Sequence, residues 1–120
     1  MRAQTRNELS GELVGLLSAT ADNGELARII RRANAGEDLT PDELFRFRER
    51  QIAMFQYWAN VHYQYRQGMY DETEFSRQRE AWRAYVNQSE AIAKQWCGVR
   101  GIVADDFASE VDSLLTRYAC

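Results

Sequence analysis

The chain has 120 residues, of which 45% are hydrophobic and 28% are charged, and these are ordinary values for a globular protein. A formal net charge of −3 argues against nucleic-acid binding, because that function needs an excess of Lys and Arg to neutralise phosphates. No stretch approaches the roughly 20 apolar residues that span a bilayer, and a single helical domain over residues 1–120 is the expectation for this length.

Two helices are predicted before Gly36. The first runs from about Gln4 to Thr20. Its apolar positions recur at the spacing of one helix face: Leu9, Leu13, Leu16, Leu17 and Thr20. The opposite face carries Gly11 and Gly15, small residues that let another helix approach closely. The second helix begins after Asn23, a good N-cap, and Gly36 ends it in a left-handed conformation.

The third and fourth helices begin with the clearest capping patterns of the chain. Thr40, Pro41 and Glu43 form a capping box with proline at the first helical position, and this helix runs over about 40–67. Asp71 begins the next helix, over about 72–87, in the same way. Because only a short turn joins them, we expect an antiparallel hairpin.

Apolar residues cover a wide arc of the 40–67 helix, which predicts a central position with neighbours on two sides. One stripe consists of Leu44, Phe47, Met54, Phe55, Trp58, Val61, His62 and Tyr65, and a second of Phe45, Ile52, Ala59 and Tyr63. A fifth helix is predicted over about 89–99, and a sixth from Asp105, with Phe107, Val111, Leu114, Leu115 and Tyr118 on one face. The predicted fold is all-α, a compact array of about six helices around the 40–67 helix.

The two cysteines, Cys97 and Cys120, are expected to be reduced, as in an intracellular protein. At most one bridge is available to them, and Cys120 is the last residue, a place where chains are poorly ordered. Cys97 lies near the C-terminal end of the fifth helix, whereas activated thiols favour helix N-termini, so it is interpreted as inert.

Aromatic residues gather between Phe45 and Tyr70 more densely than elsewhere. The favoured interpretation is a core helix whose Tyr hydroxyls reach solvent or a partner. The alternative is a contact surface or pocket, because Tyr, Trp and Arg dominate binding hot spots. The candidate binding residues are Tyr57, Trp58, His62, Tyr63, Tyr65, Arg66 and Tyr70. The segment FRFRER (45–50) is interpreted as a solvated face whose Arg stems cover apolar surface.

No residue pattern indicates catalysis or a metal. His62 is the only histidine, it lies on an apolar stripe, and no nucleophile or second ligand stands at a suitable spacing. The carboxylate groups fall at helix starts, where the helix dipole explains them. No catalytic residue, metal ligand or cofactor is therefore predicted, and an enzyme using His62 or Cys97 is the third choice of function.

Several segments resemble, in the same order, a group of uncharacterised bacterial proteins. These segments are NGELARII (23–30), LTPDELFRFR (39–48), NVHYQYRQGMYDE (60–72) and the closing F-x-x-x-V-D-x-L-L pattern (107–115). Members of this group carry an N-terminal transmembrane helix before a cytoplasmic helical domain. No activity is assigned to the group, so the resemblance implies none for this chain. The resemblance implies that residues 1–7 are a juxtamembrane stub in which Arg2 and Arg6 form a positive-inside flank. The segment QWCGVRG (95–101) departs from the group's pattern.

The leading hypothesis is a non-enzymatic interaction or scaffolding domain, cytoplasmic as given, or at the cytoplasmic face of the inner membrane in a longer form. The alternative is a small-ligand sensor with an aromatic pocket between the third and fourth helices. The expected partner is another protein or a second copy, paired as a homodimer through Gly11 and Gly15. No nucleic-acid partner is expected. Contact with a membrane is expected only through an N-terminal anchor that is absent from this chain.

Overall fold

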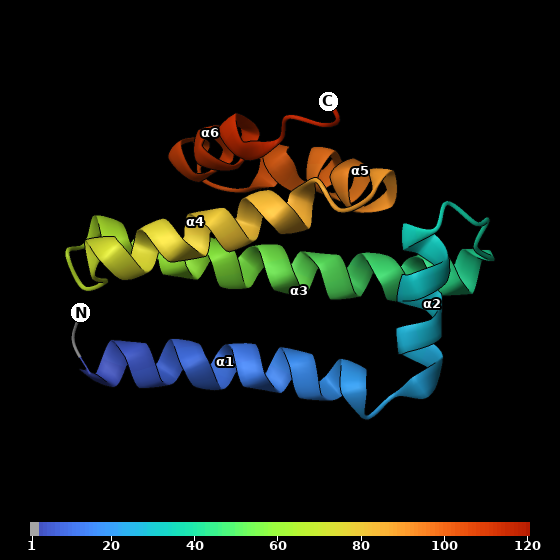
Figure 1. The fold of residues 1–120 in the computed structure, drawn as a ribbon, viewed down its shortest axis with the longest axis horizontal. Helices are drawn as coiled ribbons and strands as arrows, with labels where there is room; N and C mark the ends of the chain where they lie inside the picture. The colour runs from blue at the N-terminus through green and yellow to red at the C-terminus, as the bar shows by residue number, and fades with distance from the viewer. Residues whose placement is uncertain (1–2) are drawn as a thin grey trace.

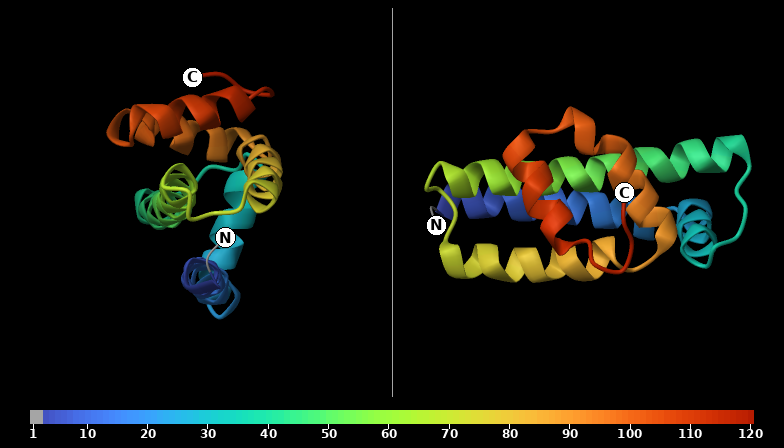
Figure 2. Two further views of the ribbon diagram at one scale, coloured as in Figure 1. Left: turned by 90° about the vertical axis from the view of Figure 1, so that its left-hand side faces the viewer. Right: turned by 90° about the horizontal axis from the view of Figure 1, so that it is seen from above.

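The computed structural model describes residues 3–120 and shows an all-α fold there, as the sequence predicts. The elements are α1 (Ala3–Ala21), α2 (Gly24–Asn34), α3 (Pro41–Arg66), α4 (Glu72–Val86), α5 (Glu90–Val99), a short 3-10 helix η1 (Arg100–Ile102) and α6 (Asp105–Leu114). They form three layers: α1 on one side, the α3–α4 pair in the middle, and α5 with α6 on the other side (Figures 1 and 2). Helix α2 crosses from α1 to the start of α3.

The central helix α3 starts and ends as its capping residues predict. The Thr40 hydroxyl accepts a hydrogen bond from the Glu43 amide (3.2 Å), and the Thr40 amide donates to the Glu43 carboxylate (2.9 Å). At the other end, Gly68 has φ +72°, a conformation that residues with a Cβ avoid. Asp71 then accepts from the Glu74 amide (3.1 Å) and begins α4. Helices α3 and α4 lie antiparallel, which confirms the predicted hairpin (Figure 2).

Aromatic rings from four helices build the core between the middle layer and the α5–α6 layer. Trp58 of α3 stacks on Trp82 of α4 with ring centroids 5.4 Å apart. Phe107 of α6 meets both Trp82 and Trp96 edge to face, at 5.9 and 5.8 Å. Such edge and stacked contacts add about 0.5–1.5 kcal/mol per pair to the burial of the rings. The hairpin and the α5–α6 layer are therefore joined by one continuous set of rings.

Helix α1 is much more exposed than its sequence stripe predicts. Only Thr5 and Leu9 are buried, whereas Val14 is 60% and Leu17 is 51% exposed. The expected inner position of Leu17 is wrong, because α1 is an outer layer. Its buried and half-buried residues form one strip that leaves Leu17 outside: Thr5, Leu9, Leu13, Leu16 and Thr20. The second stripe of α3 also needs correction, since Phe45 and Tyr63 at its two ends are 56% and 59% exposed.

Helix α6 is shorter than the apolar pattern indicates. It ends at Leu114, so Tyr118 lies in the tail and not on the helix face. Asn87 causes this ending: its side-chain oxygen accepts from the amides of Thr116 (3.0 Å) and Arg117 (2.9 Å). Its side-chain nitrogen donates to the Leu114 carbonyl at 2.8 Å. These bonds take the place of the next helical turn.

The N-terminal segment 1–7 falls partly inside the structure. Met1 and Arg2, with half of the predicted positive flank, lie outside the described residues. Ala3 to Asn7 form the first turns of α1, where Arg6 faces Glu74 of α4 at 3.7 Å. Over residues 3–120, each helix is too short or too polar to cross a bilayer.

Candidate functional site

The structure divides the seven candidate binding residues between the core and the surface. Tyr57, Trp58, His62 and Tyr70 are at least nine-tenths buried. Tyr65 is half-buried, because its ring stacks on Phe75 of α4 at 3.9 Å. Tyr63 and Arg66 are exposed.

The buried candidates fill the space between helices. Trp58 and Tyr65 stack on rings of α4, so the α3–α4 interface is packed with aromatic side chains at these positions. Burial, with a smaller contribution from the neighbouring Tyr70, raises the pKa of Tyr57 to about 12. Burial also raises the pKa of Tyr70. Both phenols are therefore neutral at physiological pH.

Three candidates meet at one hollow, which we call the α3–α6 groove. It has a volume of about 240 Å³ and lies between the C-terminal half of α3 and the start of α6. Its lining consists of Ala59, His62, Tyr63, Arg66, Gln67, Ala104, Asp106 and Phe107. Arg66 forms an ion pair with Asp106, which ties the two walls together. Of the sequence-nominated residues, His62, Tyr63 and Arg66 are thus brought together, whereas Tyr57 and Tyr70 pack elsewhere.

His62 lies at the buried side of this groove. Its ring is 5.6 Å from the ring of Phe107 and 6.0 Å from that of Phe75. Burial lowers the pKa of His62, Glu110 raises it, and Arg66 lowers it again. The imidazole is therefore neutral at physiological pH and offers one donor and one acceptor. Among residues 3–120, no three side chains of His, Cys, Asp or Glu come together as metal ligands.

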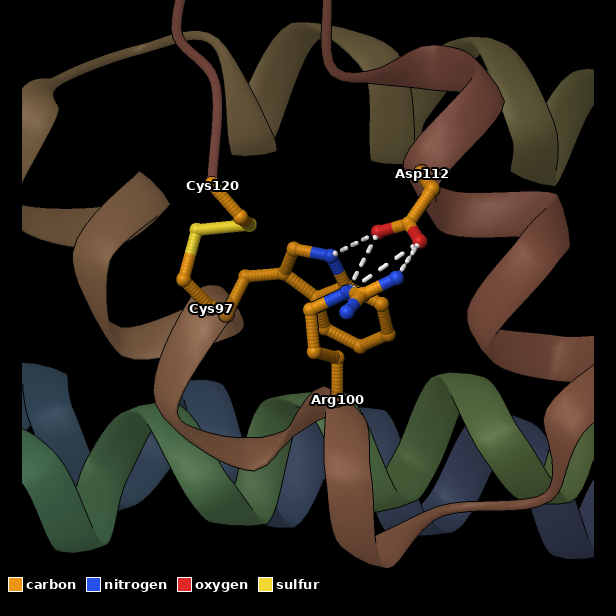
Figure 3. The surroundings of a disulfide bond; sticks show 5 residues. Cys97, Arg100, Asp112 and Cys120 are labelled. Atoms are coloured by element: carbon orange, nitrogen blue, oxygen red, sulfur yellow. Dashed lines mark hydrogen bonds and ion pairs between the residues drawn. A yellow bond between two sulfur atoms is a disulfide. The ribbon is translucent and has the colours of Figure 1, made fainter.

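The cysteines form a disulfide between Cys97 and Cys120, which corrects the expectation of two reduced thiols. Figure 3 shows the tail after α6 bringing Cys120 onto α5, where Cys97 lies. The Asn87 hydrogen bonds described above turn the chain out of α6 and toward α5. The expectation was wrong because the pairing depends on this reversal, and the sequence pattern carries no sign of it.

Next to the disulfide, Asp112 of α6 joins two residues of the α5–η1 segment (Figure 3). Its carboxylate accepts from the Trp96 indole N–H at 2.9 Å and from the Arg100 Nε at 3.1 Å. The Arg100 hydrogen bond is the main reason why the pKa of Asp112 lies below its ordinary value. These contacts join α5 and α6 beside the disulfide, and the disulfide itself leaves no thiol at Cys97 for chemistry.

A second hollow, which we call the corner hollow, was not predicted. It has a volume of about 280 Å³ and lies where α1 turns into α2 against the start of α3. Its lining consists of Leu16, Ala19, Thr20, Asn23, Leu26, Phe45, Arg46, Glu49 and Arg50. The sequence signal was the FRFRER segment, which was interpreted as a solvated face. That interpretation misses the hollow beside Phe45. The burial of Phe47, which is only 1% exposed, agrees with its predicted place on the first stripe of the helix.

Comparison with known proteins returned no match: no family model, curated protein or solved structure is similar to the chain at a significant level. The resemblance to anchored bacterial proteins therefore stays a prediction.

Proposed function

We propose that the chain is a non-enzymatic interaction domain that binds a protein partner at the α3–α6 groove. The observation that carries this proposal is the exposed ring of Tyr63 beside Arg66, at the rim of a hollow whose inner side is formed by His62 and Phe107. Tyr and Arg around an apolar depression are the composition typical of binding hot spots. A small-ligand sensor remains the alternative function, and the corner hollow is its better location.

The two rim residues are well placed to contribute affinity without supporting the fold. Tyr63 has 59% of its surface exposed, so a partner that covers the ring gains apolar burial that folding has left unused. Arg66 is already oriented by Asp106, which reduces the side-chain entropy lost on binding. An exposed ion pair of this kind adds little to stability, about 0–1 kcal/mol.

The disulfide bears on where the domain acts. Disulfides persist in oxidising compartments and are rare in the cytosol. We therefore propose a setting outside the reducing cytoplasm in place of the cytoplasmic one expected from the sequence. Rapid alkylation of intact cells followed by mass spectrometry tests this: Cys97 and Cys120 should be recovered as a disulfide-linked peptide pair. Recovery of both cysteines in alkylated form would place the domain among reduced proteins.

A site-specific photocrosslinker in place of Tyr63 tests the interaction directly. The same group at Arg48, which is exposed on α3 outside the groove lining, is the matched control. We expect one discrete adduct from position 63 and none from position 48. Adducts of the same mass from both positions would reject the groove as the contact site. A covalent pair of two identical chains would identify the partner as a second copy.

Alanine variants then measure the contribution of the rim. With the crosslinked partner purified, Tyr63→Ala and Arg66→Ala should each weaken binding about tenfold or more, as hot-spot residues do. Circular dichroism should show unchanged helicity in both variants. If helicity falls with affinity, the residues are structural and the proposal fails.

A further inference from the structure

The surface around the α3–α6 groove keeps two large apolar side chains in solvent. Tyr63 of α3 is 59% exposed, and Ile102 of η1, which closely precedes Ala104 of the groove lining, is 82% exposed. The segment that joins α5 to α6, which contains η1, projects beyond α3 on the side away from α4 (Figure 2). Among residues 3–120, no helix covers that side of α3. The groove and these two side chains therefore form an open apolar surface.

Carboxylates lie on both sides of Tyr63. One helical turn before it, the Asn60 side-chain amide donates to Glu12 of α1 at 3.3 Å. One turn after it, Arg66 pairs with Asp106 of α6. Because residues three positions apart on a helix are neighbours, Glu12 and Asp106 border Tyr63 from two different helices.

These two borders carry negative charge that the protein leaves without a counter-charge. Glu8 lies one turn before Glu12 on α1, and Asp105 precedes Asp106 at the start of α6. Glu8, Glu12 and Asp105 are exposed and form no ion pair within residues 3–120. Arg66 supplies the positive charge of the groove lining, and it is already paired with Asp106. The apolar surface is therefore bordered by an excess of negative charge.

We propose that the partner segment bound at the α3–α6 groove is a basic amphipathic helix, with a stripe of apolar side chains between two rows of Lys or Arg. This inference rests on the function proposed above, because it names the partner of the same groove. The apolar stripe would cover Tyr63 and Ile102 and place one side chain in the hollow of about 240 Å³. The basic rows would lie against Glu8 and Glu12 on one side and against Asp105 on the other.

The positions of the charges favour a helix over an extended peptide. In a β-strand, successive side chains point to opposite faces, so basic residues that alternate with apolar ones would point away from the groove. On a helix, the residues beside the apolar stripe point sideways, toward the two acidic borders. A helix therefore meets the apolar surface and both borders at once, whereas a strand does not.

Three synthetic peptides of equal length test the partner class, with the amide chemical shifts of the full chain as the readout. LKKLLKLLKKLLKL has a helical stripe of leucine flanked by lysine, LEELLELLEELLEL keeps the stripe and reverses the charge, and LKLKLKLKLKLKLK keeps the charge but alternates as a strand does. We expect saturable shifts from the first peptide at Ala59, Tyr63 and Ala104. The other two should each bind at least about tenfold more weakly, because one meets like charge and the other loses the flanking rows.

Paired charge variants of the chain test the acidic border. Glu8→Gln combined with Glu12→Gln removes two carboxylates from α1 and should weaken binding of the basic helix by about threefold to tenfold. Glu80→Gln combined with Glu90→Gln is the matched control, since both residues are exposed on α4 and α5 outside the groove lining. It changes the net charge equally and should leave the affinity within about twofold, because distant charges are screened.

A second pair of variants tests the apolar contact. Ile102→Ser should weaken binding of the basic helix about tenfold, because the helix no longer gains the burial of this side chain. Val14→Ser is the control: Val14 is 60% exposed, and it lies two residues after Glu12, so it does not face the same side of α1. Both side chains are exposed, so circular dichroism should show unchanged helicity.

Several outcomes would overturn the inference. These are an absence of shifts at the groove with the basic helix, equally tight binding there of the acidic or the alternating peptide, and an unchanged affinity in Ile102→Ser. The crosslinker at position 63 decides the proposed function separately. An adduct there with a partner that presents an acidic or extended segment would keep the groove as the contact site and reject the basic helix.

Discussion

Breaking the Cys97–Cys120 disulfide should lower the free energy of unfolding substantially. The two residues are 23 positions apart, and a closed loop of that length restricts the unfolded chain by about 3 kcal/mol at 25 °C. The loop contains η1 and α6, so its release also frees the element that supplies Phe107 to the core. The double variant Cys97→Ser, Cys120→Ser should therefore unfold at a lower urea concentration than the oxidised protein.

Urea unfolding followed by tryptophan fluorescence and circular dichroism measures the effect. With a slope of about 1.5 kcal/mol per molar urea, a loss of 3 kcal/mol moves the midpoint down by about 2 M. The oxidised protein treated with reductant should show the same shift, whereas reductant should leave the double variant unchanged. If the double variant unfolds at the midpoint of the oxidised protein, the loop-closure reasoning is refuted, and the Asn87 contacts alone hold the tail.

Three further predictions concern the helices and the groove. Trp58→Ala should destabilise the protein by about 3–5 kcal/mol in the same urea assay, because the ring is buried against Trp82; a loss below about 1 kcal/mol would return Trp58 to the surface candidates. Gly11→Ala should stabilise the protein by about 1 kcal/mol, because the added Cβ lies on a helix and meets open space. Gly68→Ala should destabilise the protein by about 1–2 kcal/mol, because Gly68 has a positive φ that a residue with a Cβ avoids. Equal effects of the two changes on stability would contradict these backbone conformations. NMR titration should give His62 a pKa below 6.5, because burial disfavours the imidazolium. The unfolded state then takes up the proton first, so stability falls as the pH drops through 6.5, and His62→Phe should remove that part of the pH dependence. A midpoint at or above 6.5 would show that the imidazole is not desolvated.

Local chemistry accounts for how well the helices of the hairpin could be predicted. Thr40 and Glu43, which are three positions apart, exchange hydrogen bonds at the start of α3. After the end of α3, Gly68 adopts a positive φ that its missing Cβ allows. Such interactions need no distant partner, so the pattern of residues is enough to locate them. The same reasoning placed Asp71 at the start of α4.

The candidate site was predictable only in part, because exposure depends on what covers a helix. The aromatic density between Phe45 and Tyr70 could not separate Trp58, which meets α4, from Tyr63, which meets solvent. Both residues belong to apolar stripes of the same helix. Only the positions of α4 and α6 decide which of them is buried.

The sequence by itself determined the helical class, the order of the helices and the ends of α2, α3 and α4, since each depends on contacts between residues three to five positions apart. The tertiary structure alone decided the pairing of Cys97 with Cys120 and the exposure of α1. These features arise where segments distant in the chain meet or fail to meet. The periodicity of a single helix carries no information about such meetings.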